Sequence, residues 1–116
     1  MTKQKILGRL KRLGLKVQRL QFPVNRAPDP PYVIYLTDED VRGDDTTINR
    51  LKNVGLSLEL YTDRLPDEAL EERIESLVLY DVPYRKNQVP IESENMVQTA
   101  YELEFVEKLK GATING

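Results

Sequence analysis

The sequence contains no cysteine, no histidine and no tryptophan among its 116 residues. Without cysteine the chain has no disulfide framework and no thiolate nucleophile, and without histidine it has no imidazole acid or base. A Cys/His zinc site and a Ser-His-Asp triad are excluded for the same reason. Tyrosines, lysines and acids remain available for catalysis, but no pairing of them has a recognisable spacing, so we expect no enzyme and no cofactor.

Long apolar runs are also absent. No stretch approaches the roughly 20 residues that span a bilayer, and residues 1–20 lack the continuous apolar segment of a signal peptide. We therefore expect a soluble protein made in a cytosol-like compartment, with no membrane contact. The composition, 40% hydrophobic and 31% charged, is typical of a folding chain. A chain of this length has room for one core, which predicts a single domain over residues 1–116.

Acidic residues are missing from the start of the chain. Residues 1–26 hold eight basic residues and no acid, a net charge of +8, whereas the rest of the chain carries −10. Three interpretations are open: a solvated helix face, docking on an acidic face of the same protein or of another copy, or nonspecific phosphate contacts with nucleic acid. A nucleic-acid-binding module would use Lys5, Arg9, Arg12, Lys16 and Arg19.

The first part of the chain predicts a helix and an extended connector, with a short run of alternating side chains between them. Thr2 is suited to cap a helix over residues 1–14, and Gly14 is suited to end it. The apolar positions of this helix form one buried stripe: Ile6, Leu7, Leu10 and Leu13. Residues 15–20 alternate apolar and basic side chains, and the prolines of residues 22–31 predict a stiff, extended connector that is not helical.

Residues 32–62 predict two strands separated by a loop. Residues 32–37 are β-branched and aromatic, which predicts a central strand buried on both faces or nearly so. Residues 55–62 alternate cleanly, with Leu56, Leu58 and Leu60 facing the core. Between them, the acids of residues 38–45 predict turn and loop material. This loop fails the ligand pattern of a calcium-binding EF-hand at two positions, so we expect a solvated loop and no metal site.

The second half predicts another helix and two strands. Pro66 suits the first helical position, followed by Asp67 and Glu68 in the first turn, and the buried stripe is Leu70, Ile74, Leu77 and Val78. Residues 81–83 end this helix. Residues 89–91 predict a short edge strand, residues 96–109 a strand, and residues 110–116 a flexible tail. The expected class is α+β: a single domain with a mostly antiparallel sheet and helices packed on it.

Several short motifs follow one another in an order that resembles that of a known family. They are PPYVIYL at residues 30–36, ELYTD at 59–63, an acidic helix, YRK at 84–86, ESENM at 92–96 and YE at 101–102. In this order and spacing, across roughly residues 22–105, the chain resembles the tail-terminator (tail-completion, tail-to-head joining) proteins of long-tailed bacteriophages and prophages. Each motif alone is common, and the resemblance depends on their order.

The resemblance implies a nonenzymatic structural protein of the virion, made in the host cytoplasm and located at the junction of head and tail. Such proteins have a sheet flanked by helices and assemble as rings, typically hexamers. The ring caps the finished tail tube, stops its polymerisation and presents a docking surface to the head connector and neck proteins. DNA contact is implied only in the lumen of the ring.

A ring would also explain opposite charges on one chain, because a head-to-tail interface joins two different surfaces of neighbouring copies. The basic segment of one subunit would meet the acidic helix or loop of the next. Two other hypotheses remain: a related neck or head-completion protein, and the small nucleic-acid-binding module. The expected interface residues are Lys5, Arg9, Arg12, Tyr32, Tyr35, Asp38, Asp40, Asp44, Asp45, Tyr61 and Arg64.

Overall fold

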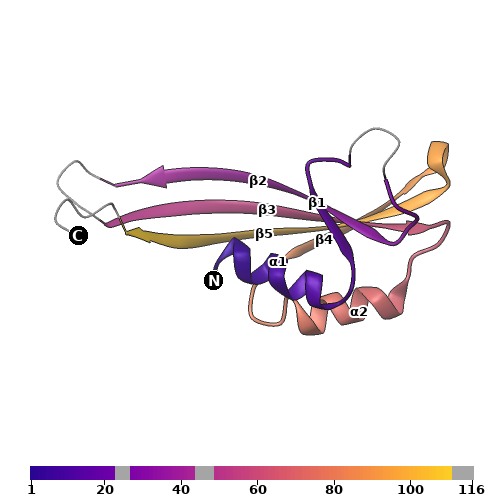
Figure 1. Cartoon of the computed structure of the whole chain (residues 1–116), viewed down its shortest axis with the longest axis horizontal. Coiled ribbons are helices and arrows are strands. Elements are labelled where there is room, and N and C mark those ends of the chain that lie inside the picture. The colour runs from indigo at the N-terminus through magenta and orange to yellow at the C-terminus, as the bar shows by residue number, and fades with distance from the viewer. Residues whose placement is uncertain (23–26, 44–48, 111–116) are drawn as a thin grey trace.

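Five strands form one mixed sheet in the order β1-β2-β3-β5-β4 (Figure 1). The computed structural model describes residues 1–22, 27–43 and 49–110. The first two strands pair in parallel and every other pair is antiparallel. The strands are β1 (Lys16–Arg19), β2 (Tyr32–Arg42), β3 (Asn49–Asp63), β4 (Arg85–Ile91) and β5 (Met96–Lys110). Together with two helices, this sheet confirms the predicted α+β class.

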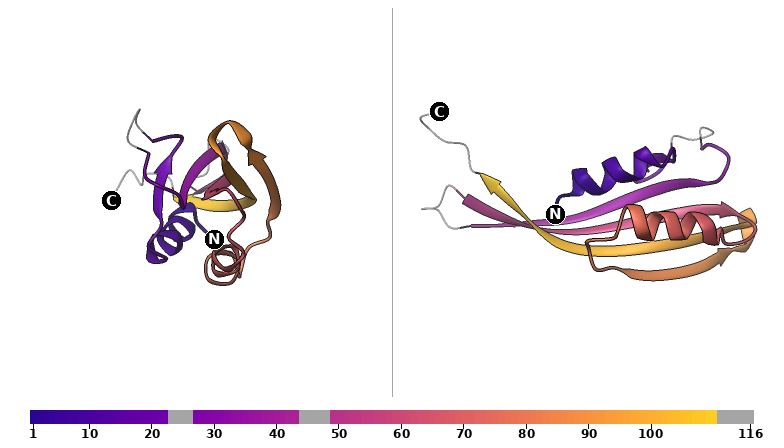
Figure 2. Two further views of the ribbon diagram at one scale, coloured as in Figure 1. Left: turned by 90° about the vertical axis from the view of Figure 1, so that its right-hand side faces the viewer. Right: turned by 90° about the horizontal axis from the view of Figure 1, so that it is seen from below.

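Both helices lie on the same face of the sheet, α1 (Lys3–Arg12) beside α2 (Glu68–Leu77) (Figures 1 and 2). The predicted start and end of α1 are confirmed: the Thr2 hydroxyl accepts a hydrogen bond from the Lys5 amide, and Gly14 adopts a φ of 83° that favours glycine. Its predicted stripe faces the core, with Leu13 partly buried. Within the described residues no helix is long and apolar enough to cross a membrane.

The core lies between the helices and one face of the sheet, which we call the inner face. Leu56, Leu58 and Leu60 of β3 point into it, as predicted, and alternate residues of β2 and β5 join them. The opposite face, which we call the open face, is covered by no helix of the described chain (Figure 2). Residues 32–37 were expected to form a central strand buried on both faces or nearly so, and β2 does lie between β1 and β3. Tyr32 on the open face and Val33 on the inner face are buried, whereas residues 34–37 are half-buried, so the expected burial is complete only at the start of the segment.

The acidic segment after residue 37 is strand and not loop, which corrects the prediction. Residues 38–42 continue β2 and pair with residues 51–55 of β3. Asp38 pairs with Gly55 and Asp40 with Asn53 on the open face, where their carboxylates remain in water. Cross-strand pairing thus overrides the turn-like composition. The predicted loop residues Asp44 and Asp45 lie outside the described residues.

The second helix differs from the prediction at both ends. Asp67 is its N-cap, accepting a hydrogen bond from the Leu70 amide, so Pro66 precedes the helix instead of occupying its first position. The helix ends at Leu77, earlier than residues 81–83. Leu77 is 52% exposed, and Leu79, in the turn after the helix, takes its place in the core. The chain stops being helical at Val78, so helical spacing no longer predicts which of the following side chains are buried.

The last two strands lie where residues 89–91 and 96–109 predict them, but β4 begins at Arg85, four residues earlier than expected. Strand β4 is an edge strand, and Pro90 lies near its end, where a missing amide hydrogen is tolerated. Strand β5 extends through Lys110, so the expected tail is one residue shorter at its start; residues 111–116 lie outside the described residues. The described part of the connector, residues 27–31, is not helical, as expected.

The molecule is elongated, because three strands continue past the helices. Its Cα radius of gyration is 16.7 Å, whereas a compact chain of this length has about 13 Å. Lys3, at the start of α1, reaches Glu39 and Glu107, and β2, β3 and β5 project beyond this point (Figure 1). We call these projecting strand ends the extension: residues 41–42, 49–51 and 108–110. Within it, Val41 is 45% and Leu51 49% exposed.

Candidate functional site

The open face carries an aromatic cluster where the sheet is widest. Tyr32 and Tyr61 face each other on β2 and β3, with ring centroids 5.2 Å apart and planes at 21°, and Phe22 packs edge-on against Tyr32. The Tyr61 hydroxyl donates to Glu59 and accepts from Gln98. Burial raises the pKa of both tyrosines, so both hydroxyls stay protonated at neutral pH. The cluster is therefore a packed, neutral part of the open face.

Next to this cluster, the open face becomes acidic and hollow. Asp38 and Glu104 flank Gly55 across the sheet, and Glu102 and Asp40 lie in the adjacent rows. Gly55, which has no side chain, leaves a shallow hollow of about 400 Å³ between the acids, whose lining includes Asp38, Asp40, Asn53, Gly55, Glu104 and Val106. We call this surface the acidic hollow. No group of metal-ligating side chains suited to an ion occurs among the described residues.

The outward side of α1 is basic, but one of the basic residues of the helix, Arg9, forms an ion pair within its own chain. Arg9 forms two hydrogen bonds with Asp81, at 2.7 and 3.1 Å, donates to the Val78 carbonyl and lies 4.5 Å from the centre of the Tyr80 ring. Its guanidinium therefore fastens α1 to the turn after α2. The residues that remain exposed on the outward side are Gln4, Lys5, Lys11 and Arg12, with Gly8 between them. We call this surface the basic helix face.

A compact ion cluster marks the point where the helix cover ends. Lys52, on β3, lies between Glu39 and Glu107 of the neighbouring strands, at 3.1 and 3.4 Å, and the Lys3 ammonium lies 3.0 Å from Glu39. Hydrogen bonds from Lys3 and Lys52 hold the pKa of the Glu39 carboxyl below its ordinary value. These charged groups make the inner face of the strands polar immediately beyond the core. The apolar core therefore ends at this cluster, and the extension begins there.

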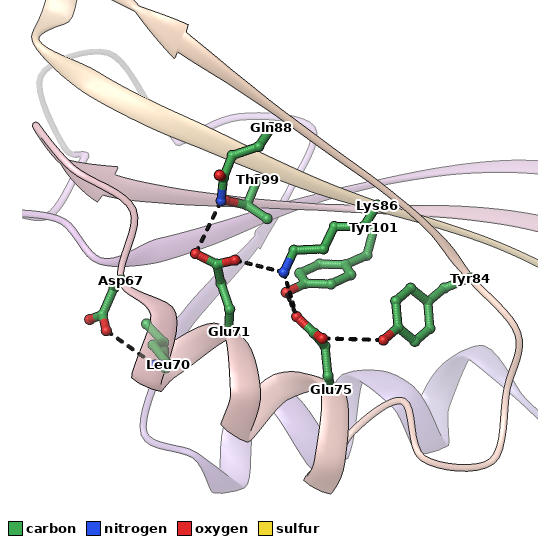
Figure 3. Close-up of polar contacts among 9 residues, drawn as sticks. All are labelled: Asp67, Leu70, Glu71, Glu75, Tyr84, Lys86, Gln88, Thr99 and Tyr101. Carbon is green, nitrogen blue, oxygen red and sulfur yellow. Dashed lines mark hydrogen bonds and ion pairs between the residues drawn. The ribbon is translucent and has the colours of Figure 1, made fainter.

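A second polar network joins α2 to the edge strand (Figure 3). Glu71 is only 5% exposed, and its carboxylate accepts from the Lys86 ammonium at 2.7 Å and from the Gln88 amide at 3.0 Å. The same Gln88 amide donates to the buried Thr99 hydroxyl. Both Lys86 and Gln88 belong to β4. The network therefore holds the edge strand against α2.

Glu75 is the other acceptor of this network. It accepts from Lys86 at 2.7 Å, from the Tyr101 hydroxyl at 2.8 Å and from the Tyr84 hydroxyl at 3.3 Å (Figure 3). Burial opposes its ionisation, but these hydrogen bonds outweigh burial and keep the pKa of the Glu75 carboxyl below its ordinary value. Burial and the nearby carboxylates raise the pKa of Tyr101. These shifts move Glu75 and Tyr101 away from neutral pH, opposite to what acid-base catalysis needs, so the network has a structural character.

The pKa of Glu75 predicts how acid weakens the fold. The carboxyl titrates near its ordinary value of 4.5 in the unfolded chain and lower in the folded one, so its contribution to stability is complete above about 4.5 and is lost as the pH falls through the folded pKa. In Glu75→Gln, the free energy of unfolding should fall less between pH 6 and pH 3 than in the wild type. Urea unfolding at each pH measures this difference.

The matched control for that experiment is Glu72→Gln, an exposed residue of the same helix. It should follow the wild-type dependence on pH. Equal slopes for Glu75→Gln and the wild type would mean that the hydrogen bonds to Glu75 add nothing to stability.

The expected interface residues do not gather in one place. Tyr32, Tyr61, Asp38 and Asp40 share the open face, and Lys5 and Arg12 lie on the basic helix face. Arg9 is engaged within its own chain, and Tyr35 faces the core. Arg64 follows β3 with a φ of 61°, at the end of the sheet away from the extension. Asp44 and Asp45 lie outside the described residues.

Sequence reasoning missed Glu102, Glu104 and Lys11 as surface candidates. The first two were visible as the polar positions of the alternating segment 96–109, but only the register of β5 places them beside Asp38 and Gly55. Lys11 follows from the helical spacing, since it falls outside the buried stripe of Ile6, Leu7 and Leu10.

No protein-family model matches the chain, and no curated protein is significantly similar to it in sequence.

Proposed function

We propose that this chain is a structural assembly protein that forms a ring from copies of itself, as a tail terminator does: the ring caps a tail tube, ends tube polymerisation and offers a docking surface to a head connector. The extension is the observation that carries this proposal. Its strands project beyond the helical layer, so neither face of the extension is covered by the described chain.

The side chains around the extension favour a protein partner. Val106, 52% exposed, and Leu51 are diagonal neighbours on the open face, and Val41 is exposed on the inner face. A ribbon of strands needs a packed face to be stable on its own, and exposed apolar side chains gathered in one place are typical of interaction sites. A neighbouring copy or the tube would cover them.

The rest of the molecule is consistent with a building block. Glu71 and Glu75 share Lys86, Tyr101 is buried and protonated, and Arg9 is paired with Asp81. The described polar clusters are satisfied within the chain, and the two surfaces left over, the open face and the basic helix face, lie on opposite sides of the molecule (Figure 2). Such a pair of surfaces suits head-to-tail contacts, which form a ring when the rotation between neighbouring copies closes.

Light scattering over a concentration series, with and without a cognate tail-tube protein, tests this function. We expect a ring-sized oligomer, formed free in solution or on the tube, and shorter tubes when the protein is added during tube polymerisation. Electron microscopy of the tube ends serves as the second readout. A chain that stays monomeric, leaves tube length unchanged and binds duplex DNA would contradict the proposal and favour the nucleic-acid-binding module.

A further inference from the structure

We propose that the acidic hollow on the open face of one copy receives the basic helix face of α1 from a second copy. This inference rests on the proposed function, because it names the two surfaces that join neighbours in the ring. It replaces the acidic helix or loop, expected from the sequence as the counter-charge, with the open face of the sheet.

The acidic hollow has an excess of unpaired negative charge. Its carboxylates belong to Asp38, Asp40, Glu102 and Glu104, all exposed. Among the described residues three cations lie nearby: Arg42 contacts Asp40 at 3.4 Å, Arg85 is the cross-strand neighbour of Glu102, and Lys108 follows Val106 on the open face of β5. Both members of the Arg42–Asp40 pair are strongly exposed, so this contact adds little stability and opens easily.

The basic helix face has the complementary charge and no acid of its own. Lys5, Lys11 and Arg12 are exposed, and within the described residues none of them lies in an ion pair. The acid-free sequence before residue 27 ensures that no carboxylate of α1 offsets them. Because α1 packs on the inner face, these charges point away from their own acidic hollow, and only another molecule brings the two surfaces together.

The two surfaces also agree in size and shape. Asp38 and Glu104 are separated by two strand spacings, about 10 Å. Lys5 and Arg12 are separated by seven helical residues, also about 10 Å. Gly8 lies between the cations, and a Cβ placed there would meet nothing within 4 Å, so the helix backbone is accessible at this point. In the proposed contact, the helix surface without a side chain at Gly8 of one copy faces the hollow at Gly55 in the sheet of the other copy.

The contact is head-to-tail. Each copy offers its helix to one neighbour and its open face to the other, so the interface repeats around a ring instead of closing as a two-fold dimer. The ion pairs are solvent-accessible, which predicts salt-sensitive assembly, since charges separated by more than about 10 Å are screened at 0.1 M salt.

Charge exchange between two variants tests the proposal. The helix variant carries Lys5→Glu, Lys11→Glu and Arg12→Glu, and the sheet variant carries Asp38→Lys, Asp40→Lys and Glu104→Lys. All six positions are exposed, so both variants should keep the wild-type circular dichroism spectrum. Each variant alone should need about a thirtyfold higher concentration for half-assembly, because three attractions become repulsions. An equimolar mixture should assemble within about threefold of the wild type, as an alternating ring.

The control variant is Glu92→Lys with Glu94→Lys, two exposed acids in the short 3₁₀ helix between β4 and β5. It changes net charge in the same direction as the sheet variant and should assemble like the wild type. Normal assembly of both charge variants, or a mixture that stays dissociated while the wild type assembles, would overturn the inference but leave the proposed function standing.

Three further outcomes decide between the two proposals or against both. A wild type that assembles through these faces but ignores the tail tube would support the inference and overturn the proposed function. A wild type that stays monomeric at every concentration and on the tube would overturn both. A helix variant that assembles normally and loses affinity for duplex DNA would overturn the inference and assign Lys5, Lys11 and Arg12 to nucleic acid.

Discussion

Trimming the extension is expected to abolish assembly while leaving the domain folded. In the trimmed variant, Asn-Gly replaces residues 41–52 and the chain ends after Glu107. Asp40 and Asn53 are cross-strand partners, so a two-residue turn fits between them. Ring formation should be lost at ten times the concentration that the wild type needs, because the uncovered strands and their apolar side chains are gone.

The fold should survive because the removed part contributes little to the core. Val54 and the described core residues remain, and of the described residues that are removed only Lys52 is well covered. The free energy of unfolding, measured in urea, should fall by about 1–2 kcal/mol, in the range of a lost peripheral ion cluster. Analytical ultracentrifugation then reports the oligomeric state of a folded chain.

A matched control shortens the opposite end of the sheet. Asn-Gly replaces residues 92–95 between the paired residues Ile91 and Met96, far from the extension (Figure 1). This variant should assemble as the wild type does. Assembly of the trimmed variant at the wild-type concentration would show that the extension is dispensable and would remove the main support for a ring-forming role.

Lys86→Met is expected to destabilise the fold by about 3 kcal/mol. The ammonium of Lys86 lies 2.7 Å from both Glu71 and Glu75, and Glu71 is nearly inaccessible to water. Removing one partner of a buried pair leaves a desolvated charge and costs about 3–5 kcal/mol; the lower end applies because Lys86 is one-third exposed. Urea unfolding at pH 7 measures the loss.

The companion variants show whether charge is the cause. Adding Glu71→Gln to Lys86→Met removes the buried carboxylate, and the double variant should recover at least half of the loss. Arg85→Met, the preceding residue on the opposite face of β4, should change stability by less than about 0.5 kcal/mol. A double variant no more stable than Lys86→Met would indicate lost side-chain packing instead of an unpaired charge.

Local patterns in the sequence were sufficient where one residue type determines the backbone. Thr2 and Gly14 mark the limits of α1, and the alternation of Leu56, Leu58 and Leu60 identifies both β3 and its buried face. The same patterns failed at residues 38–42, whose acids resemble a loop. These residues form a strand because they pair with β3 and because the carboxylates on the open face remain hydrated.

The candidate surfaces were predictable only in part. Lys5, Arg12, Asp38 and Asp40 were identified from charge alone, and they do lie on exposed surfaces. Arg9 carries the same charge as Lys5, yet it pairs with Asp81, 72 residues away in sequence. No local pattern distinguishes the two, because the difference lies in what the turn after α2 places beside each of them.

The sequence by itself determined what this protein lacks and how its charge is divided: no thiol, no imidazole, and a basic start followed by an acidic remainder. Only the tertiary structure decided which charges are used within the chain and which face outward. Lys3, Lys52 and Arg9 neutralise acids in their own chain. The basic helix face and the acidic hollow end on opposite sides of one sheet, because strand register and helix packing, and not composition, set the direction of each side chain.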